Sequence, residues 1–181
     1  MTPRTTPRTL LAIDGTVAAY AIGGAVLYGI LGLFAVTVGA ASARPGFALV
    51  PFVGYTAGPL AGFVAGFGGQ GIVDLVAGAP GFSWSQSLAS GAAGLVAGLA
   101  WLLVPRLVGG SLRDRALGGS VAGVVGSLVG GLLLLIPGQG QAGNVQLGAV
   151  VAQVAANAIV SAVLVPVLVY AWAPIIESIR T

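Results

Sequence analysis

The sequence contains no cysteine, no histidine and no lysine among its 181 residues. Without cysteine, the chain forms no disulfides and offers no thiolate for catalysis or for iron–sulfur ligation. Without histidine, the usual zinc sites and histidine-based triads are not expected. Without lysine there is no Walker A loop, so the chain does not hydrolyse ATP by that mechanism. We therefore expect no catalytic residues, no metal site and no cofactor.

Charged residues are also scarce, at 6% of the sequence, whereas 57% of the residues are hydrophobic. Soluble globular domains carry about 25% charged residues. A soluble fold of this size would need more charge to cover its surface. Together with a mean hydropathy of +1.04, this composition predicts an integral membrane protein, with residues 1–181 forming a single membrane domain.

Continuous apolar runs, separated by glycine and proline, predict a six-helix all-α bundle. They do not alternate, which argues against an outer-membrane barrel. Because one crossing takes about 20 residues, the length allows no more than six or seven spans. The second run is the weakest, since 12 residues span about 18 Å of a core about 30 Å thick. The predicted helices cover 17–38, 46–57, 60–76, 84–104, 116–136 and 145–171.

The arginines orient this predicted bundle. With six crossings, the arginines near both chain ends and those of segment 106–115 share one side; with five, that segment falls opposite the N-terminus. The positive-inside rule therefore favours six spans with both termini cytoplasmic, and it places Arg44 outside. The basic residues sit at helix ends without interleaved aromatics, so we expect no nucleic-acid binding.

The sequence has 31 glycines, many of them spaced four residues apart, as in Gly62 and Gly66 or Gly94 and Gly98. In lipid, small residues let helix backbones approach closely. We expect these glycines to pack helices together within the chain. Residues 66–71 match the G-x-G-x-x-G pattern, but they lie in an apolar run with no preceding strand, which excludes dinucleotide binding.

Polar side chains gather in the outward half of the predicted bundle. Gln70 and Asp74 lie near the outer end of the third helix, and Trp84 and Gln86 open the fourth. Polar groups in hydrocarbon are costly, which makes them functional candidates. The inner halves of these helices are nearly all Ala, Leu, Val and Gly. The asymmetry predicts a cup open to the outside, because a channel needs polar lining along its whole depth.

The sixth predicted helix adds Gln153 and Asn157, which share one helical face. They either contact a ligand or form an interhelical hydrogen bond worth ~0.6 kcal/mol. Asp74 either contacts a ligand or lies at the membrane interface, where it pairs with Arg44 or with water. Trp84 is either an aromatic wall for a flat ligand or an interfacial belt residue. The predicted substrate-binding residues are Arg44, Gln70, Asp74, Trp84, Gln86, Gln153 and Asn157.

Residues 43–75 contain a short apolar run, then Gly-Pro-Leu-Ala-Gly-Phe at 58–63, and end in Asp74-Leu75. This stretch resembles the substrate-binding S components of energy-coupling factor (ECF) vitamin transporters. Those proteins have a short second helix, a Gly-Pro-Leu-x-Gly-Phe-like turn and a third helix ending in Gly-Asp-Leu. Val73 stands where that glycine is expected.

Ala21 and Ala25 are similar to the family's Ala-x-x-x-Ala motif, which docks on a transmembrane coupling subunit. The resemblance implies a multi-pass protein of the prokaryotic cytoplasmic membrane that captures a vitamin or vitamin precursor from outside. A coupling subunit and two ATPase subunits would supply the energy, which fits the missing ATP motif. The metal-transporting branch carries an N-terminal histidine motif that this chain lacks.

Other functions remain as alternatives to this interpretation. A self-contained small transporter or channel would need polar lining in the inner half as well. A membrane enzyme would need an acid–base or nucleophile set, and the sequence places no second carboxylate near Asp74. A purely structural membrane module would not need the outer polar groups.

Overall fold

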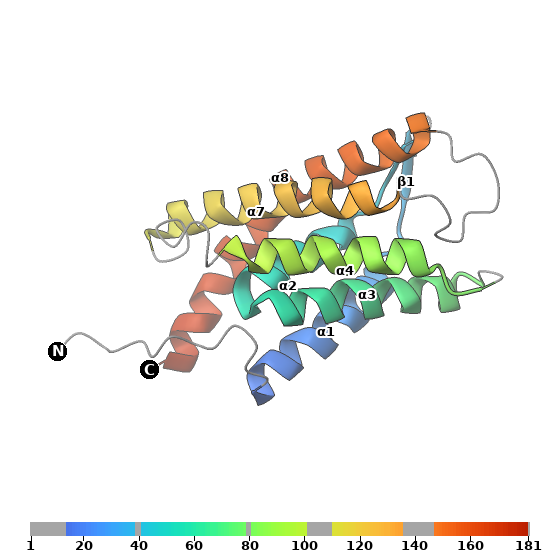
Figure 1. Cartoon of the computed structure of the whole chain (residues 1–181). Helices are drawn as coiled ribbons and strands as arrows, with labels where there is room; N and C mark the ends of the chain where they lie inside the picture. Colours follow the sequence, from blue (N-terminus) through green and yellow to red (C-terminus); the bar gives the residue numbers. More distant parts are fainter. Residues whose placement is uncertain (1–13, 39–40, 79–80, 101–109, 136–146, 181) are drawn as a thin grey trace.

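The computed structural model describes residues 14–38, 41–78, 81–100, 110–135 and 147–180, and helices make up about 84% of them. A hairpin of strands β1 (Val36–Val38) and β2 (Ala41–Ala43), followed by the 3-10 turn η1 (Pro45–Ala48), links the first two helices. The predicted all-α class is confirmed for the described residues apart from this hairpin (Figure 1). The α-helices are α1 (Gly15–Leu31), α2 (Leu49–Ala57), α3 (Pro59–Val76), α4 (Trp84–Gly98), α7 (Leu112–Leu133) and α8 (Leu147–Arg180).

Within the described residues, three helices are long and apolar enough to cross a membrane, namely α3, α7 and residues Leu147–Pro174 of α8. Large apolar side chains cover their outer surfaces; Val121 of α7 is 53% exposed and Ile159 of α8 is 65% exposed. In water, an apolar surface of this extent would drive association or aggregation. The structure is therefore that of an all-α bundle consistent with a membrane protein.

Helix α2 lies at the centre of the bundle, because it contacts each of the other five described helices. Its residues Val50 to Tyr55 are all buried, as expected for a helix that is apolar on every side. The outer helices follow one another around it, with α3 between α1 and α4, and α7 between α4 and α8. With nine residues, α2 spans only about 13 Å and is too short to cross a bilayer alone.

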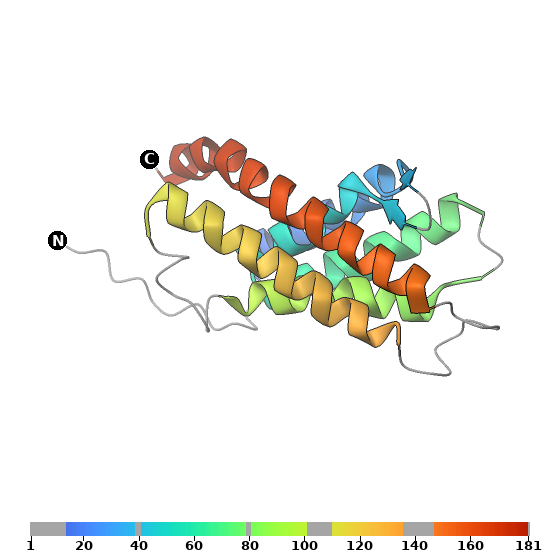
Figure 2. The same ribbon diagram turned by 90° about the horizontal axis from the view of Figure 1, so that it is seen from above.

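Helices α1 and α3 run parallel, since Gly24 lies beside Ala65 and Gly29 beside Ile72. Helix α4 returns antiparallel to α3, with Gly94 against Gly62 and Ser90 against Gly66. Figure 2 shows α7 and α8 side by side, and α8, which contains Pro166 and Pro174, bending along its length.

Glycines bring backbone directly against backbone at the centre of the structure. A Cβ atom on Gly62 would overlap the Gly94 carbonyl, and one on Gly54 would overlap the same group. The prediction that glycine pairs pack helices within the chain is confirmed. The turn between α2 and α3 is made by Gly58, whose φ of +108° is a conformation that other residues rarely adopt.

The first predicted helix, 17–38, is too long. Helix α1 ends at Leu31, and Val36–Val38 form β1. The β-branched Val36-Thr37-Val38 run favours a strand, and it pairs antiparallel with Ala41–Ala43.

The other predicted boundaries also shift. Pro45 opens a 3-10 turn, so the second helix starts at Leu49 instead of residue 46. The fifth helix starts at Leu112 because Ser111 and Asp114 form a capping box. The sixth continues to Arg180. Residues 101–104, the end of the fourth predicted helix, lie outside the described residues.

Candidate functional site

A buried hydrogen-bonded cluster is centred on Gln70 of α3. The Tyr28 hydroxyl of α1 donates to Gln70 Oε1 at 2.8 Å. Gln70 Nε2 donates to Asp74 Oδ1 at 2.9 Å and to Gln86 Oε1 of α4 at 3.3 Å. Tyr28, Gln70 and Asp74 are only 1%, 2% and 7% exposed. We call Tyr28, Arg44, Gln70, Asp74 and Gln86 the polar cluster.

The sequence of α3 explains why Gln70 and Asp74 lie together in the polar cluster. Gln70 and Asp74 are four residues apart and lie on one helical face. Gly66, one turn earlier on the same face, meets the backbone of Ser90 and brings α4 close enough for Gln86 to reach Gln70. Asp74 Oδ2 accepts from the Ser83 backbone N–H at the start of α4, at 2.9 Å. A carboxylate at a helix N-terminus is favourable because of the helix dipole.

Arg44, between β2 and η1, completes the polar cluster. Its Nη1 donates to Gln70 Oε1 at 3.5 Å, and its side chain and Ser90 both lie beside the Tyr28 hydroxyl. The alternative in which Arg44 pairs with Asp74 is not observed, because the structure shows no ion pair between these two described side chains. Arg44 instead reaches the carboxylate indirectly, through the Gln70 amide.

Two buried polar atoms have no hydrogen-bond partner among the described residues: Arg44 Nε and Ser87 Oγ. Ser87 is fully buried. It lies one turn before Ser90 and next to Gln86, and therefore at the level of Gln70. Leaving a buried donor or acceptor unpaired costs about 1–3 kcal/mol, and more for a charged group. Arg44 Nε therefore gives the polar cluster hydrogen-bonding capacity that the described residues do not use, and Ser87 Oγ adds a second unpaired group, one residue along α4 from Gln86.

Gln153 and Asn157 lie outside this cluster. Gln153 Nε2 donates to Asn157 Oδ1 at 3.1 Å and to the Ser42 carbonyl oxygen of β2 at 2.8 Å. The prediction that the two amides share a helical face is confirmed. Their contacts join α8 to the hairpin.

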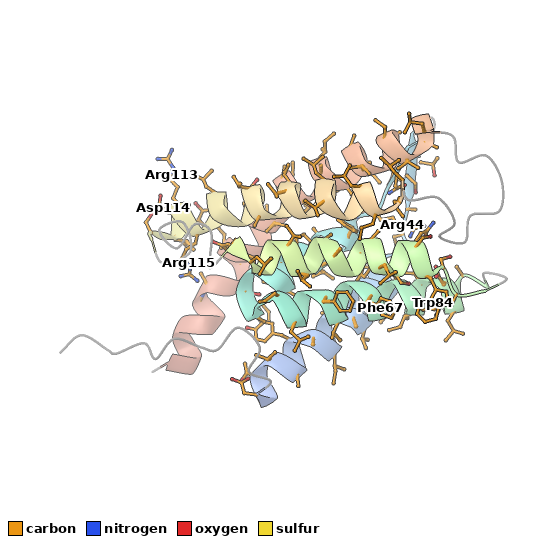
Figure 3. The ribbon with its side chains drawn as sticks, viewed as in Figure 1. Arg44, Phe67, Trp84, Arg113, Asp114 and Arg115 are labelled. Atoms are coloured by element: carbon orange, nitrogen blue, oxygen red, sulfur yellow. The ribbon has the colours of Figure 1, made fainter. Side chains whose placement is uncertain are left out.

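Trp84 is also separate from the polar cluster. It is 62% exposed and packs against Phe82 and Phe67, with ring centroids 4.7 Å and 6.0 Å away. In the view of Figure 3, Arg44 lies above α4, and Trp84 and Phe67 lie below it. The structure thus brings together Arg44, Gln70, Asp74 and Gln86 but leaves Trp84 outside.

Ala21 and Ala25 are buried, at 6% and 8% exposure. Ala25 faces Gly68 and Gly69 of α3, and Ala21 belongs to the apolar core that includes Val53 of α2. The prediction that these alanines dock a partner does not fit this placement, because neighbouring helices already cover their methyl groups.

Sequence reasoning left Tyr28 out of the site. It lies three residues after Ala25 and seven after Ala21, so it shares their buried face of α1. A hydroxyl on an otherwise small-residue face was the available signal. Ser87 and Ser90 also occupy buried positions on the α4 face that meets α3.

An apolar cavity of about 300 Å³ lies apart from these polar groups, between the end of α1, η1 and α8. Its lining includes Leu31, Gly46 and Leu168, with no charged or amide side chain. It therefore offers no polar contact to orient a solute.

The sequence matches no known protein family, and neither curated proteins nor solved structures gave a match. The resemblance to S components therefore rests on the sequence motifs alone. Among the described residues, no three metal-ligating side chains gather. Chemically, the polar cluster offers hydrogen-bond donors and acceptors and one residue of each formal charge, which suits recognition of a polar molecule.

Proposed function

We propose that this chain is the solute-binding S component of an ECF-type importer, capturing a small vitamin-like molecule from outside a prokaryotic cell. The observation that carries the proposal is the buried polar cluster, in which Arg44 Nε finds no hydrogen-bond partner among the described residues, with the equally unpaired Ser87 Oγ one residue from Gln86. A protein that needed only stability would gain by filling such a site with apolar side chains.

The charges support a six-span topology with both termini cytoplasmic. Arg113 and Arg115 lie at one end of the bundle, and Arg44 lies toward the other (Figure 3). The positive-inside rule assigns the more basic end to the cytoplasm. Because α1 and α3 run parallel, the chain returns between them through η1 and α2, which counts as a crossing although α2 is short. In this topology, the polar cluster lies toward the outer end of the bundle.

The polar cluster favours a small polar solute without net charge. Arg44 and Asp74 carry opposite formal charges and are linked through Gln70. A ligand with a net charge would add an uncompensated charge to a buried site, which is costly. A neutral heterocycle with hydrogen-bond acceptors and donors would instead pair with Arg44 Nε and Ser87 Oγ.

Transport by this mechanism requires partners. The chain has no lysine and so no Walker A loop. In the proposed assembly, a transmembrane coupling subunit and two ATPases supply the energy, while this chain binds the solute. The apolar surface that faces lipid would let the chain reorient in the membrane without carrying charges through hydrocarbon.

Native mass spectrometry of the purified protein tests the binding role. We expect a vitamin-sized adduct on the wild type and on the control Ser127→Ala, whose hydroxyl bonds to Gly123 and Ser161 and to no residue of the polar cluster. Gln70→Leu should lose most of the adduct, because it removes the centre of the polar cluster. An adduct of equal occupancy on Gln70→Leu would exclude the polar cluster as the site.

Reconstitution separates an importer subunit from a self-contained transporter. The molecule identified as the adduct would be loaded outside liposomes containing this chain alone. We expect binding without accumulation inside, because the energy source is missing. Uptake by the chain alone would overturn the S-component proposal in favour of an independent transporter.

A further inference from the structure

The position of Arg44 depends on the hairpin. Ser42 in β2 pairs with Thr37 of β1, and Arg44 follows two residues later in an extended conformation with φ −114° and ψ 102°. Because its backbone is extended, Arg44 continues the direction of strand β2. Whatever holds Ser42 therefore also restrains the Arg44 backbone, from which the guanidinium reaches Gln70.

Helix α8 holds Ser42 through one amide. Gln153 Nε2 donates to the Ser42 carbonyl at 2.8 Å, across 111 residues of sequence. The same nitrogen donates to Asn157 Oδ1 at 3.1 Å. An amide nitrogen has two hydrogens, so these two bonds use both. Asn157 thus fixes the orientation in which Gln153 reaches the hairpin.

A continuous path results, made of hydrogen bonds except for the covalent backbone between Ser42 and Arg44. It runs from Asn157 and Gln153 to the backbone at Ser42, then to Arg44, which donates to Gln70 at 3.5 Å. Helix α8 also packs against β2 and η1 on either side of Arg44. The segment that carries the one cation of the polar cluster is therefore clamped from the α8 side.

We propose that Gln153 and Asn157 are positioning residues, which act on the solute site through Ser42 and Arg44 without touching the solute. This assignment rests on the proposed function only in taking the polar cluster as the solute site. It replaces direct ligand contact, the role predicted for these amides from sequence. It also predicts that Arg44 leaves the polar cluster when the Gln153 contact is broken.

A cysteine reporter tests the clamp without any ligand. The chain has no cysteine, so Ala43→Cys, the half-buried neighbour of Arg44, would be the sole thiol. Its rate of reaction with a soluble maleimide would be measured in nanodiscs, where both faces are accessible. We expect Gln153→Leu to raise this rate by about fivefold, the factor that loss of one hydrogen bond implies.

Two further variants separate the hydrogen bond from packing. Gln153→Glu keeps the size of the side chain but loses the amide donor, so it should also raise the rate. Ser161→Ala alters the same helix at its contact with Ser127 and should leave the rate unchanged. Equal labelling rates in the Ala43→Cys protein with and without Gln153→Leu and Gln153→Glu would overturn the clamp.

Adduct occupancy then tests the link to Arg44. If Gln153 acts through Arg44, Gln153→Leu should lower occupancy in the wild type but cause no further loss in an Arg44→Leu protein. Additive losses would mean that Gln153 contacts the solute directly, and would contradict the positioning role. The maleimide result does not depend on a solute, so failure of the clamp and failure of the proposed function are distinguishable.

Discussion

The two ends of the bundle are closed in different ways. Toward the end that carries Arg44, helices α1, α3 and α4 meet through buried amide, hydroxyl and carboxylate groups. There, Arg44 Nε and Ser87 Oγ have no hydrogen-bond partner among the described residues. Toward the other end, Trp172 meets Tyr20 and Phe52 edge to face, with ring centroids 6.1 Å and 6.2 Å away. The Trp172 indole N–H donates to the Tyr20 hydroxyl at 2.7 Å, which satisfies that donor.

The two ends contribute differently, one to the stability of the fold and the other to a specific polar site. The aromatic end buries apolar area, and the Trp172 N–H and the Tyr20 hydroxyl are paired with each other. These contacts therefore stabilise the folded protein without any ligand. The polar end holds a cation and a carboxylate in low-dielectric surroundings, where incomplete pairing is costly. Such a site is better suited to a function than to holding helices together.

The largest expected effect comes from the backbone contact between Gly62 of α3 and Gly94 of α4, on which both ends depend for the packing of these helices. Gly62→Ala places a methyl group into the Gly94 backbone, and overpacking of this kind should lower stability by about 3 kcal/mol or more. Thermal unfolding followed by tryptophan fluorescence measures it. The matched control is Gly23→Ala on α1, where a Cβ meets nothing within 4 Å. Equal unfolding temperatures for the two variants would contradict the backbone contact.

At the polar end, Gln70→Leu should destabilise the protein by about 2 kcal/mol, because it leaves the Tyr28 hydroxyl and Asp74 Oδ1 without their partner. The same unfolding assay measures the change. Stability equal to or above the wild type would mean that the polar cluster is already hydrated, and that its residues are not desolvated as described.

At the aromatic end, Trp172→Phe removes the indole N–H but keeps an aromatic ring near Tyr20 and Phe52. We expect the smallest loss, about 1 kcal/mol, as for one neutral hydrogen bond. Adduct occupancy in native mass spectra should stay at the wild-type level. Loss of the adduct in this variant would show that the two ends are coupled and would remove the contrast between them.

Local sequence patterns predicted the helices and much of the polar cluster. Apolar runs located the helices, and the spacing of Gln70 and Asp74 set their common face. Small-residue spacing predicted close packing, although not which neighbour Ala21 and Ala25 would meet. That spacing is the same whether the neighbouring helix belongs to the chain or to a partner.

The features that could not be predicted depend on contacts between distant residues. Tyr28 reaches Gln70 across 42 residues, and Gln153 reaches Ser42 across 111. No local pattern encodes such pairs. The hairpin was missed for a different reason, because Val36-Thr37-Val38 continues an apolar run, and hydropathy alone does not separate a strand from the end of a helix.

The glycine contacts among α2, α3 and α4 also limit how the protein can move. Where main chain lies on main chain, as at Gly54, Gly62 and Gly94, no layer of side chains can change rotamer. Sliding of these three helices past one another is therefore more restricted than at contacts made by side chains. Gln70 and Gln86 lie on α3 and α4, whereas Tyr28 and Arg44 lie on α1 and beside the hairpin. Under the proposed function, an opening that moved α1 and the hairpin away from α3 would break the Tyr28–Gln70 and Arg44–Gln70 hydrogen bonds.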